Sequence, residues 1–307
     1  MGHSNSERNT FHVKTVEYNK KLMENFYNAF SKGEFEEIFQ YVTPDFVMHV
    51  PGKGLNAGEY WYKEGFKKFL DHIVSFGGGV FSLSIPAIAV NVDSVFTREQ
   101  IRMNRKENPE ELWLLQFVME YKIKDGLIAE AWTIPIEGDV YDTFWTPGSK
   151  FKNPSNPLIS EKPQTISESL ANSYSLENEK IVRDFYHYFW NSDLDSMAKN
   201  IVDDFELWVP GNSFLSGTYK TKQGYLAFRD KLLSNVAGDR YKLDWESFAC
   251  SEKEVFVKEH IRMNRSWDEQ IKTNFAVFHF QLENGKIIRI NDIPLDAIAY
   301  DDFFTKK

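Results

Sequence analysis

The chain repeats itself, and this repeat constrains the fold more than any other feature. Phe26-Tyr27 recurs 159 residues later as Phe185-Tyr186, and the run Ile-Arg-Met-Asn-Arg at 101–105 returns unchanged at 261–265. Glycines and prolines at expected turns recur at the same spacing. Such a repeat is far longer than a solenoid unit of roughly 20–50 residues. The sequence therefore predicts two copies of one whole domain.

The length of 307 residues suits two domains of ordinary size. We place a polar N-terminal tail at 1–14, the first domain at 15–146 and the second at 176–307. The segment between them, 147–175, is rich in Pro, Ser and Asn, which is typical of a linker. Its length would let the copies dock as an intrachain pseudo-dimer. The same faces could instead pair two chains as a homodimer.

Charge and hydrophobicity argue against several functions. A net charge of −9 disfavours nucleic acid, whose phosphates require basic patches. No apolar run approaches the roughly 18 residues of a membrane span. A single cysteine, Cys250, excludes an intrachain disulfide, so a cytoplasmic location is the simplest expectation. The 7 histidines lack metal-ligand spacing, and no phosphate-binding loop is present, so we predict no metal and no cofactor.

Hydrophobic periodicity gives the same order of elements in each copy. Helical spacing predicts helices near 22–30 and 62–75, with counterparts near 181–189 and 222–235. Strand-like runs fill the remainder of each copy. Helices followed by a meander of strands predict an α+β domain with helices on one face of an antiparallel sheet.

Two-residue turns fix the last hairpin of each copy. Asn284-Gly285 is typical of a type I′ turn, as is Asp125-Gly126 in the first copy. Counting from the turn predicts that Asp292 lies opposite Val277 and diagonal to His279, on one face. That face mixes a few polar groups with an apolar wall, which favours a small-molecule pocket.

Three segments carry a family likeness: Glu-Asn-Phe-Tyr-Asn-Ala-Phe at 24–30, Pro-Asp-Phe through Val-Pro-Gly at 44–52, and Glu-Asn-Gly-Lys-Ile through Asn-Asp at 283–292. They resemble the SnoaL-like branch of the nuclear-transport-factor-2-like superfamily. The last segment looks especially like the phenazine-biosynthesis A/B proteins. The resemblance implies two tandem cone-shaped domains, each a curved antiparallel sheet wrapped around N-terminal helices with a deep apolar cavity.

The resemblance also implies where chemistry occurs. The family places an acid/base carboxylate on the last strand, where this chain has Asp292 and the first copy has Thr133. We expect Asp292 to be catalytic with His279 as its partner. His260 and Arg262 join them if their side of the strand is the inner one. The alternative is that Glu259, Ile261 and Met263 line the cavity.

Further residues are expected to contact the substrate: Trp208, Tyr225, Phe275, Val277 and Ile290 in the second copy, and His49 and Glu120 in the first. The repeated Arg102 and Arg262 favour a salt bridge between the copies. The Asp-Arg-Asp set of limonene-epoxide hydrolases is absent, because His260 and Gln100 stand where that family has its Arg.

These residues predict a cofactor-independent acid/base enzyme, an isomerase, cyclase or condensing enzyme. Its substrate would be a small apolar or aromatic metabolite in secondary-metabolite biosynthesis. One alternative is a binding or carrier protein without catalysis. Another is an epoxide-type hydrolase that uses water held by Asp292.

Overall fold

The computed structural model describes residues 5–156, 164–236, 242–265 and 271–305, with side chains from residue 12 onward. The chain divides into two compact units. Unit 1 contains most described residues up to Tyr174, and unit 2 contains residues 135–139 and most residues from Ser175 onward. Residues 1–4 of the predicted tail and 157–163 of the predicted linker lie outside the described residues. The pseudo-dimer stays a prediction.

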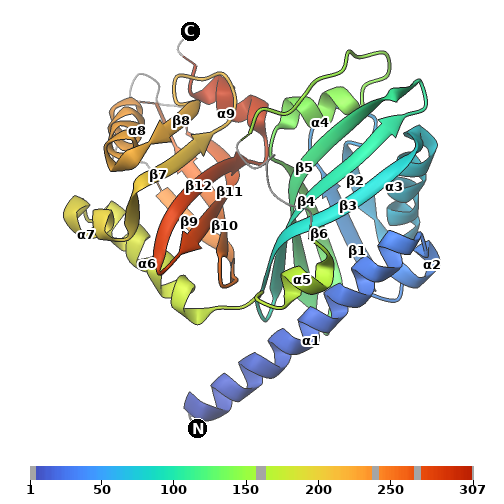
Figure 1. The fold of residues 1–307 in the computed structure, drawn as a ribbon, viewed down its shortest axis with the longest axis horizontal. Helices are drawn as coiled ribbons and strands as arrows, with labels where there is room; N and C mark the ends of the chain where they lie inside the picture. Colours follow the sequence, from blue (N-terminus) through green and yellow to red (C-terminus); the bar gives the residue numbers. More distant parts are fainter. Residues whose placement is uncertain (1–4, 157–163, 237–241, 266–270, 306–307) are drawn as a thin grey trace. The chain divides into compact units, whose positions relative to one another are not determined.

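Unit 1 contains a six-stranded sheet in the order β2-β1-β6-β5-β4-β3. Helices α1 and α3 lie on one face of this sheet (Figure 1). The strands are β1 (Val42–Val50), β2 (Gly58–Trp61), β3 (Gly77–Val90), β4 (Ser94–Arg105), β5 (Asn108–Lys124) and β6 (Leu127–Pro135). The helices are α1 (Asn5–Lys32), α2 (Phe35–Ile38), α3 (Tyr62–Phe76), α4 (Gly138–Phe144) and α5 (Ile166–Leu170).

Unit 2 repeats this topology in the order β8-β7-β12-β11-β10-β9. Its strands are β7 (Ile201–Val209), β8 (Gly217–Lys220), β9 (Lys242–Cys250), β10 (Glu254–Met263), β11 (Lys272–Glu283) and β12 (Lys286–Pro294). Its helices are α6 (Leu176–Trp190), α7 (Leu194–Lys199), α8 (Thr221–Asn235) and α9 (Ala297–Phe303). The predicted α+β class and the two tandem copies of one fold are confirmed.

Each sheet departs from the expected antiparallel meander at one place. β1 pairs with β6 in parallel, and β7 pairs with β12 in parallel. After β2 the chain passes through helix α3 to β3 at the opposite edge of the sheet. The meander β3-β4-β5-β6 then runs back across the sheet, and β6 pairs with the edge of β1 that β2 leaves free. Pairing of the first strand with the last brings residues from both ends of a copy together.

The last hairpin of unit 2 contains a β-bulge that the sequence did not reveal. Asn284 and Gly285 both have positive φ, 50° and 72°, as a type I′ turn requires. Leu282 then pairs with Ile287, but Gln281 pairs with Arg289, so Ile288 is an extra residue on β12. One extra residue moves every following side chain to the other face relative to its partner strand.

The N-terminal tail and the linker both contribute helix. Helix α1 begins at Asn5, so much of the polar tail is helical. Helix α5 lies in the predicted linker and begins with a capping box, in which Thr165 accepts from the Glu168 amide. Ser169 on this helix donates to Ile85 O of β3. The end of the linker is therefore attached to the first sheet.

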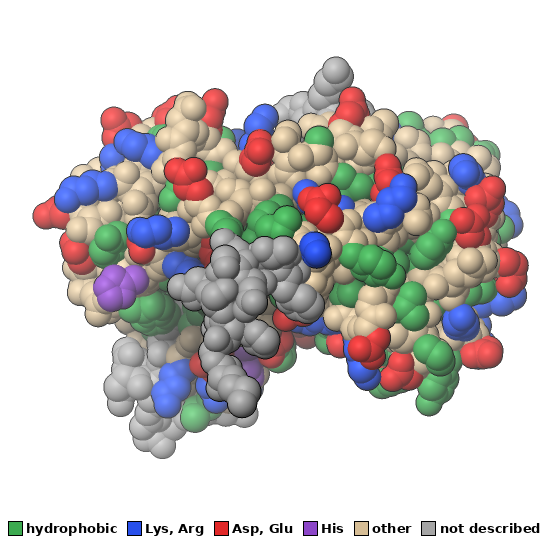
Figure 2. Space-filling model, turned by 90° about the horizontal axis from the view of Figure 1, so that it is seen from below, with side chains coloured by type: hydrophobic (Ala, Val, Ile, Leu, Met, Phe, Trp, Pro, Cys, Tyr) green, Lys and Arg blue, Asp and Glu red, His purple; other side chains and the backbone are tan. Residues whose placement is uncertain are grey.

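The surface mixes charges of both signs. On the face in Figure 2, acidic and basic side chains are interspersed, with hydrophobic side chains between them. Within the described residues, no helix is long and apolar enough to cross a membrane.

Candidate functional site

Unit 2 encloses an apolar cavity of about 50 Å³ between its helices and the inner face of its sheet. Its wall is mainly aromatic and aliphatic, from strands β7, β10, β11 and β12 and helices α6, α8 and α9. Two carboxylates, Glu259 and Asp292, interrupt this wall. The cavity is smaller than the roughly 150 Å³ that holds a benzene molecule. A ring-sized ligand would therefore enter only if lining side chains move.

Glu259 projects from β10 and is fully buried. Tyr186 of helix α6 donates a hydrogen bond to Glu259 Oε1. The other oxygen, Oε2, is buried and has no hydrogen-bond partner among the described residues. One side of this carboxyl group is therefore fixed, and the other is available to a molecule in the cavity.

Asp292 projects from β12 and is almost fully buried. Tyr300 of helix α9 donates a hydrogen bond of 2.5 Å to Asp292 Oδ2. Asp292 Oδ1 is buried and lacks a hydrogen-bond partner within the described part of the chain. Asp292 and Glu259 thus have the same arrangement: one oxygen accepts a hydrogen bond from a tyrosine, and the other has no partner among the described residues.

Burial raises the pKa of both carboxyl groups. The pKa of Asp292 rises to about 7 through loss of solvation, although the hydrogen bond from Tyr300 lowers it. The pKa of Glu259 is raised well above its usual value, first by burial and also by the charge of Asp292, against the hydrogen bond from Tyr186. Two buried carboxyl groups with raised pKa values in one cavity do not both ionise readily near neutral pH.

Unit 1 contains an equivalent cavity of about 60 Å³, but its polar groups differ. Glu99 occupies the position of Glu259. Its Oε1 accepts hydrogen bonds from Tyr27, from Thr97 at 2.9 Å and from Tyr121 at 3.4 Å. Burial raises the pKa of Glu99 to about 7, and these three bonds lower it. Thr133 stands where unit 2 has Asp292, so the first cavity has one carboxylate where the second has two.

The copies differ because unit 2 lacks two of the hydrogen-bond donors that surround the carboxylate in unit 1. Val257 and Phe280 replace Thr97 and Tyr121, so Glu259 retains only the tyrosine of the first helix. Losing these donors leaves a carboxylate less stabilised in its ionised form, since hydrogen bonds to the charged form lower a pKa.

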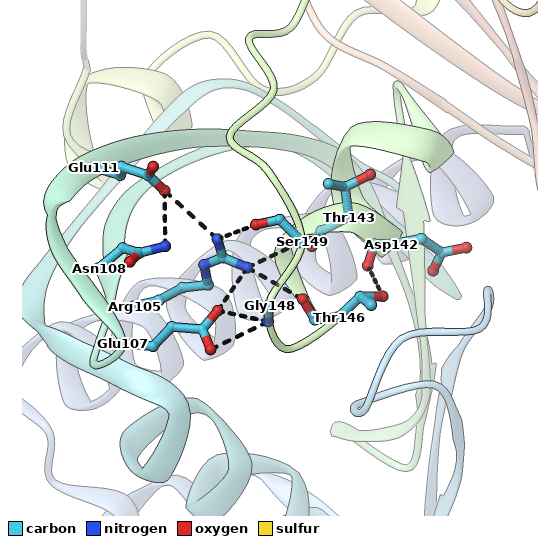
Figure 3. Close-up of polar contacts among 9 residues, drawn as sticks. All are labelled: Arg105, Glu107, Asn108, Glu111, Asp142, Thr143, Thr146, Gly148 and Ser149. Atoms are coloured by element: carbon cyan, nitrogen blue, oxygen red, sulfur yellow. Dashed lines mark hydrogen bonds and ion pairs between the residues drawn. The ribbon is translucent and has the colours of Figure 1, made fainter.

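A helix after the last strand closes each cavity, and an arginine of the repeated run contacts this helix or the turn beyond it. In unit 1, α4 supplies Tyr141 to the cavity, and Trp145 follows directly after it. Figure 3 shows Arg105 reaching the turn beyond this helix. Its Nη1 donates to Thr146 O at 3.1 Å and Ser149 Oγ at 2.9 Å, and its Nη2 donates to Ser149 O at 2.7 Å.

Two glutamates complete this arginine site. Arg105 forms ion pairs with Glu107 at 3.0 Å and Glu111 at 3.5 Å (Figure 3). Its guanidinium group also lies 4.9 Å from the centre of the Trp113 ring. In unit 2, Arg265 donates to Asp302 O of α9 at 2.7 Å. The last arginine of the repeated run therefore holds the closing helix in both copies.

The rest of the repeated run also has a structural role. Ile101 and Met103 line the first cavity, and Ile261 and Met263 line the second. The arginine between them points away: Arg262 is exposed and pairs with Asp244.

Three predicted site residues line the cavity of unit 2: Asp292, Ile290 and Tyr225. The predicted neighbourhood of His279 and Asp292 on one face is wrong. The bulge at Ile288 pairs Asp292 with Phe278 and His279 with Asn291, so the two side chains lie on opposite faces. His279 instead contacts Glu254 and lies 3.1 Å from Asn291 Nδ2.

The same reversal moves other predicted residues out of the cavity wall. Phe278 and Phe280 line the cavity where Phe275 and Val277 were expected. On β10 the alternative prediction is correct: Glu259, Ile261 and Met263 line the cavity. His260 and Arg262 therefore lie on the opposite face. His260 stacks on Phe275 there, with ring centres 4.6 Å apart.

The prediction for the first strand of each copy misses by one residue. Met48 and Leu207 line the cavities, whereas His49 and Trp208 lie on the other face. His49 stacks on Trp132 with ring centres 3.9 Å apart. Glu120 is also absent from the wall and pairs with Lys122 at 2.7 Å.

Sequence reasoning missed the tyrosines. Tyr186 and Tyr300 each bond a cavity carboxylate, and both have tyrosine counterparts in the first copy, Tyr27 and Tyr141. A comparison of polar residues kept in both copies would have found them. Among the described residues, no group of three or more His, Cys, Asp or Glu side chains is placed to hold a metal ion.

Comparison with known proteins gives one family match and several similar solved structures. Residues 23–131 match the family described as "SnoaL-like domain". No curated protein matches the sequence. Among solved structures, the chain is similar to Bal32a from a soil-derived mobile gene cassette, with 19% identity, 42% of this chain and 96% of that chain covered, and a TM-score of 0.39.

Two further structures are similar. An NTF2-like protein from Burkholderia xenovorans has 20% identity over 42% of this chain and 96% of its own, with a TM-score of 0.38. A putative SnoaL-like polyketide cyclase from Jannaschia has 14% identity over 43% of this chain and 93% of its own, with a TM-score of 0.37.

The family match lies in unit 1, and unit 2 has the same strand order and the repeated sequence. Residues 23–131 of unit 1 are therefore similar to the SnoaL-like domain, and unit 2 repeats the strand order and part of the sequence of unit 1.

Proposed function

We propose that unit 2 is an acid/base catalyst that transfers a proton within a small, largely apolar metabolite, as an isomerase, cyclase or condensing enzyme does. The observation that carries this proposal is the carboxyl pair. Asp292 Oδ1 and Glu259 Oε2 are both unpartnered in the described structure, and both side chains line one apolar cavity.

The chemistry follows from the shared environment. With raised pKa values, the pair holds a proton near neutral pH, so one member is a base and the other an acid. The ionised carboxylate takes a proton from a carbon next to a carbonyl group, and the protonated partner gives a proton to the carbonyl oxygen. The first carboxyl group then gives its proton to another carbon while its partner takes back the proton of the enol oxygen, which completes an isomerisation. In a cyclisation the enol carbon attacks a second carbonyl group instead, the first carboxyl group protonates the oxygen of that carbonyl, and the partner takes back the enol proton.

Each tyrosine positions one carboxyl group. Tyr186 and Tyr300 each occupy one oxygen, so the remaining oxygen of each group is the one available to the substrate. Such pre-positioning is favourable because the reacting atoms need not be ordered during the reaction. Leu207, Phe278 and Ile290 form part of the apolar wall that would exclude water.

A deuterium-exchange assay tests this proposal. A panel of small cyclic and linear ketones is incubated with the full chain in D₂O, and exchange next to the carbonyl is followed by proton NMR. We expect exchange with at least one ketone to fall about 100-fold or more in Asp292→Asn and in Glu259→Gln. The matched control is Glu99→Gln, which removes the equivalent carboxylate of unit 1 and should leave the rate unchanged. Full exchange in both unit 2 variants would contradict the proposal.

A binding or carrier role is the second candidate, and the first cavity favours it. Glu99 Oε1 is occupied by three hydroxyl groups, and Thr133 supplies no carboxylate. A chain that exchanges no ketone yet binds one in both cavities would fit this role. The same variants test the hydrolase alternative. In that test, the release of a diol from an epoxide is measured.

We place the metabolite in secondary-metabolite biosynthesis in the cytoplasm as part of this proposal. The apolar cavity and the resemblance to the phenazine proteins support it. The genes next to this one would test it by naming a pathway.

A further inference from the structure

Unit 1 has a second hollow outside the carboxylate site. It is a groove of about 610 Å³ between the end of α1, the end of α3 and the beginning of β3. Four residues, Phe30, Ile73, Phe81 and Met103, line both this groove and the first cavity. The groove and the cavity therefore share a wall, and the groove has the volume of an ordinary small-molecule site.

The lining of the groove is apolar although it faces solvent. Val74, Val80 and Phe81 are 57%, 46% and 40% exposed. The run Gly77-Gly78-Gly79 keeps the floor open, because Gly79 has no side chain and a φ of 100° that other residues rarely adopt. Exposed apolar residues that gather in a concave surface are typical of a binding site.

The charges at this groove have one sign. Its lining contains two lysines, Lys32 and Lys106, and no acidic residue. Lys32 forms an exposed ion pair with Glu34 at 3.7 Å, outside the groove lining, and Lys106 forms no ion pair with the described residues. An apolar trough with cationic groups on its lining is complementary to an apolar molecule with an anionic end.

We propose that this groove binds an anionic amphiphile: a molecule with an aliphatic or aromatic body and one negatively charged group. The body lies against Phe30, Val74 and Phe81, and the charged group lies near Lys32 and Lys106. This site is separate from the carboxyl pair of unit 2 and does not depend on the function proposed there.

A matched pair of probes tests the proposal. 8-Anilinonaphthalene-1-sulfonate and N-phenyl-1-naphthylamine share an aromatic body, but only the first is charged. Both are titrated into the full chain and followed by fluorescence. In Lys32→Gln/Lys106→Gln we expect the dissociation constant of the sulfonate to rise about fivefold, since two exposed charges each contribute little, and that of the neutral probe to stay the same.

A second variant tests the apolar wall. Val74→Asp/Val80→Asp places two acids in the groove at exposed positions, and we expect binding of both probes to weaken about tenfold or more. Leu112→Asp is the control, because Leu112 is 50% exposed on β5 and does not line the groove. Octanoate should displace the sulfonate probe at concentrations at which octan-1-ol does not.

Two results would overturn the proposal. In one, the lysine variant binds the sulfonate as tightly as the wild type. In the other, both probes bind the Val74/Val80 variant unchanged, which would place them elsewhere in the chain. Asp292→Asn should leave these titrations unaffected, so failure of this proposal is separable from failure of the catalytic one.

Discussion

Tyr300 Oη lies 2.5 Å from Asp292 Oδ2, and this hydrogen bond joins helix α9 to the strand that precedes it. The contact has two consequences. It fixes the carboxyl group in the cavity wall, and it opposes the effect of burial on the Asp292 pKa.

Removing this hydroxyl should therefore raise the pKa of Asp292 further. In Tyr300→Phe we expect a rise of about one unit above the present value of about 7, because hydrogen bonds to a charged group contribute roughly 1.5–3 kcal/mol. Carbon-13 NMR of labelled aspartate, with Asp292→Asn as the assignment control, measures it. An unchanged pKa would mean that this hydrogen bond does not stabilise the ionised group.

Asp292 should make unit 2 less stable as the pH rises. Its folded pKa is raised from 3.8 to about 7, so the folded state keeps a proton that the unfolded state has released. The stabilisation is present below about pH 4 and declines by about 1.4 kcal/mol per pH unit until about pH 7.

Asp292→Asn removes this dependence. Urea unfolding at pH 5 and pH 7 measures this. The free energy of unfolding of the variant, relative to that of the wild type, should rise by about 2–3 kcal/mol from pH 5 to pH 7. Asp244→Asn, which alters an exposed carboxylate of the same unit, is the control and should show no such gain. Parallel curves for wild type and Asp292→Asn would contradict the prediction.

Two arginines of the repeated run should differ greatly in their effect on stability. Arg105 is fully buried with five polar contacts, so Arg105→Gln removes the cation that pairs with Glu107 and Glu111 and the donors to Thr146 O and Ser149 O. We expect a loss of about 3–5 kcal/mol in the free energy of unfolding. Arg262→Gln removes one ion pair of a side chain that is 44% exposed, and should cost less than about 1 kcal/mol. Equal losses in thermal melts of the two variants would refute the assigned role of Arg105.

The single cysteine should be inert in the folded protein. Cys250 is buried, and burial raises the pKa of its thiol, so little thiolate is present or accessible at pH 8. We expect its reaction with a disulfide reagent to be about 100-fold slower in buffer than in urea. Fast labelling of the folded chain would indicate that β9 opens readily.

Much of the fold could be predicted because the relevant signals are local or repeated. The Asn-Gly and Asp-Gly turns, the helical periodicity and the internal repeat all predicted the elements. Asp292 was placed in the cavity because its family position is on the last strand. None of these signals depends on contacts between distant parts of the chain.

It was harder to predict which side chains of each strand face the cavity, and the reason is physical. β10 is buried on both faces over most of its length, so apolar and polar residues do not alternate along it. Without alternation, only strand pairing decides which side chains face the cavity. On β12 that pairing depends on the bulge at Ile288, which no composition signal marks.

Ile288 works as a one-residue spacer between the turn and the reactive end of β12. With it, the cavity receives Phe278, Phe280 and Asp292; a uniform ladder from the same turn would have placed Asp292 beside His279. The chain thus carries two alternative sets of side chains on one hairpin. The number of residues in β12 therefore determines which set of side chains lines the cavity. Deleting Ile288 would restore the uniform pairing and turn Asp292 to the face of His279.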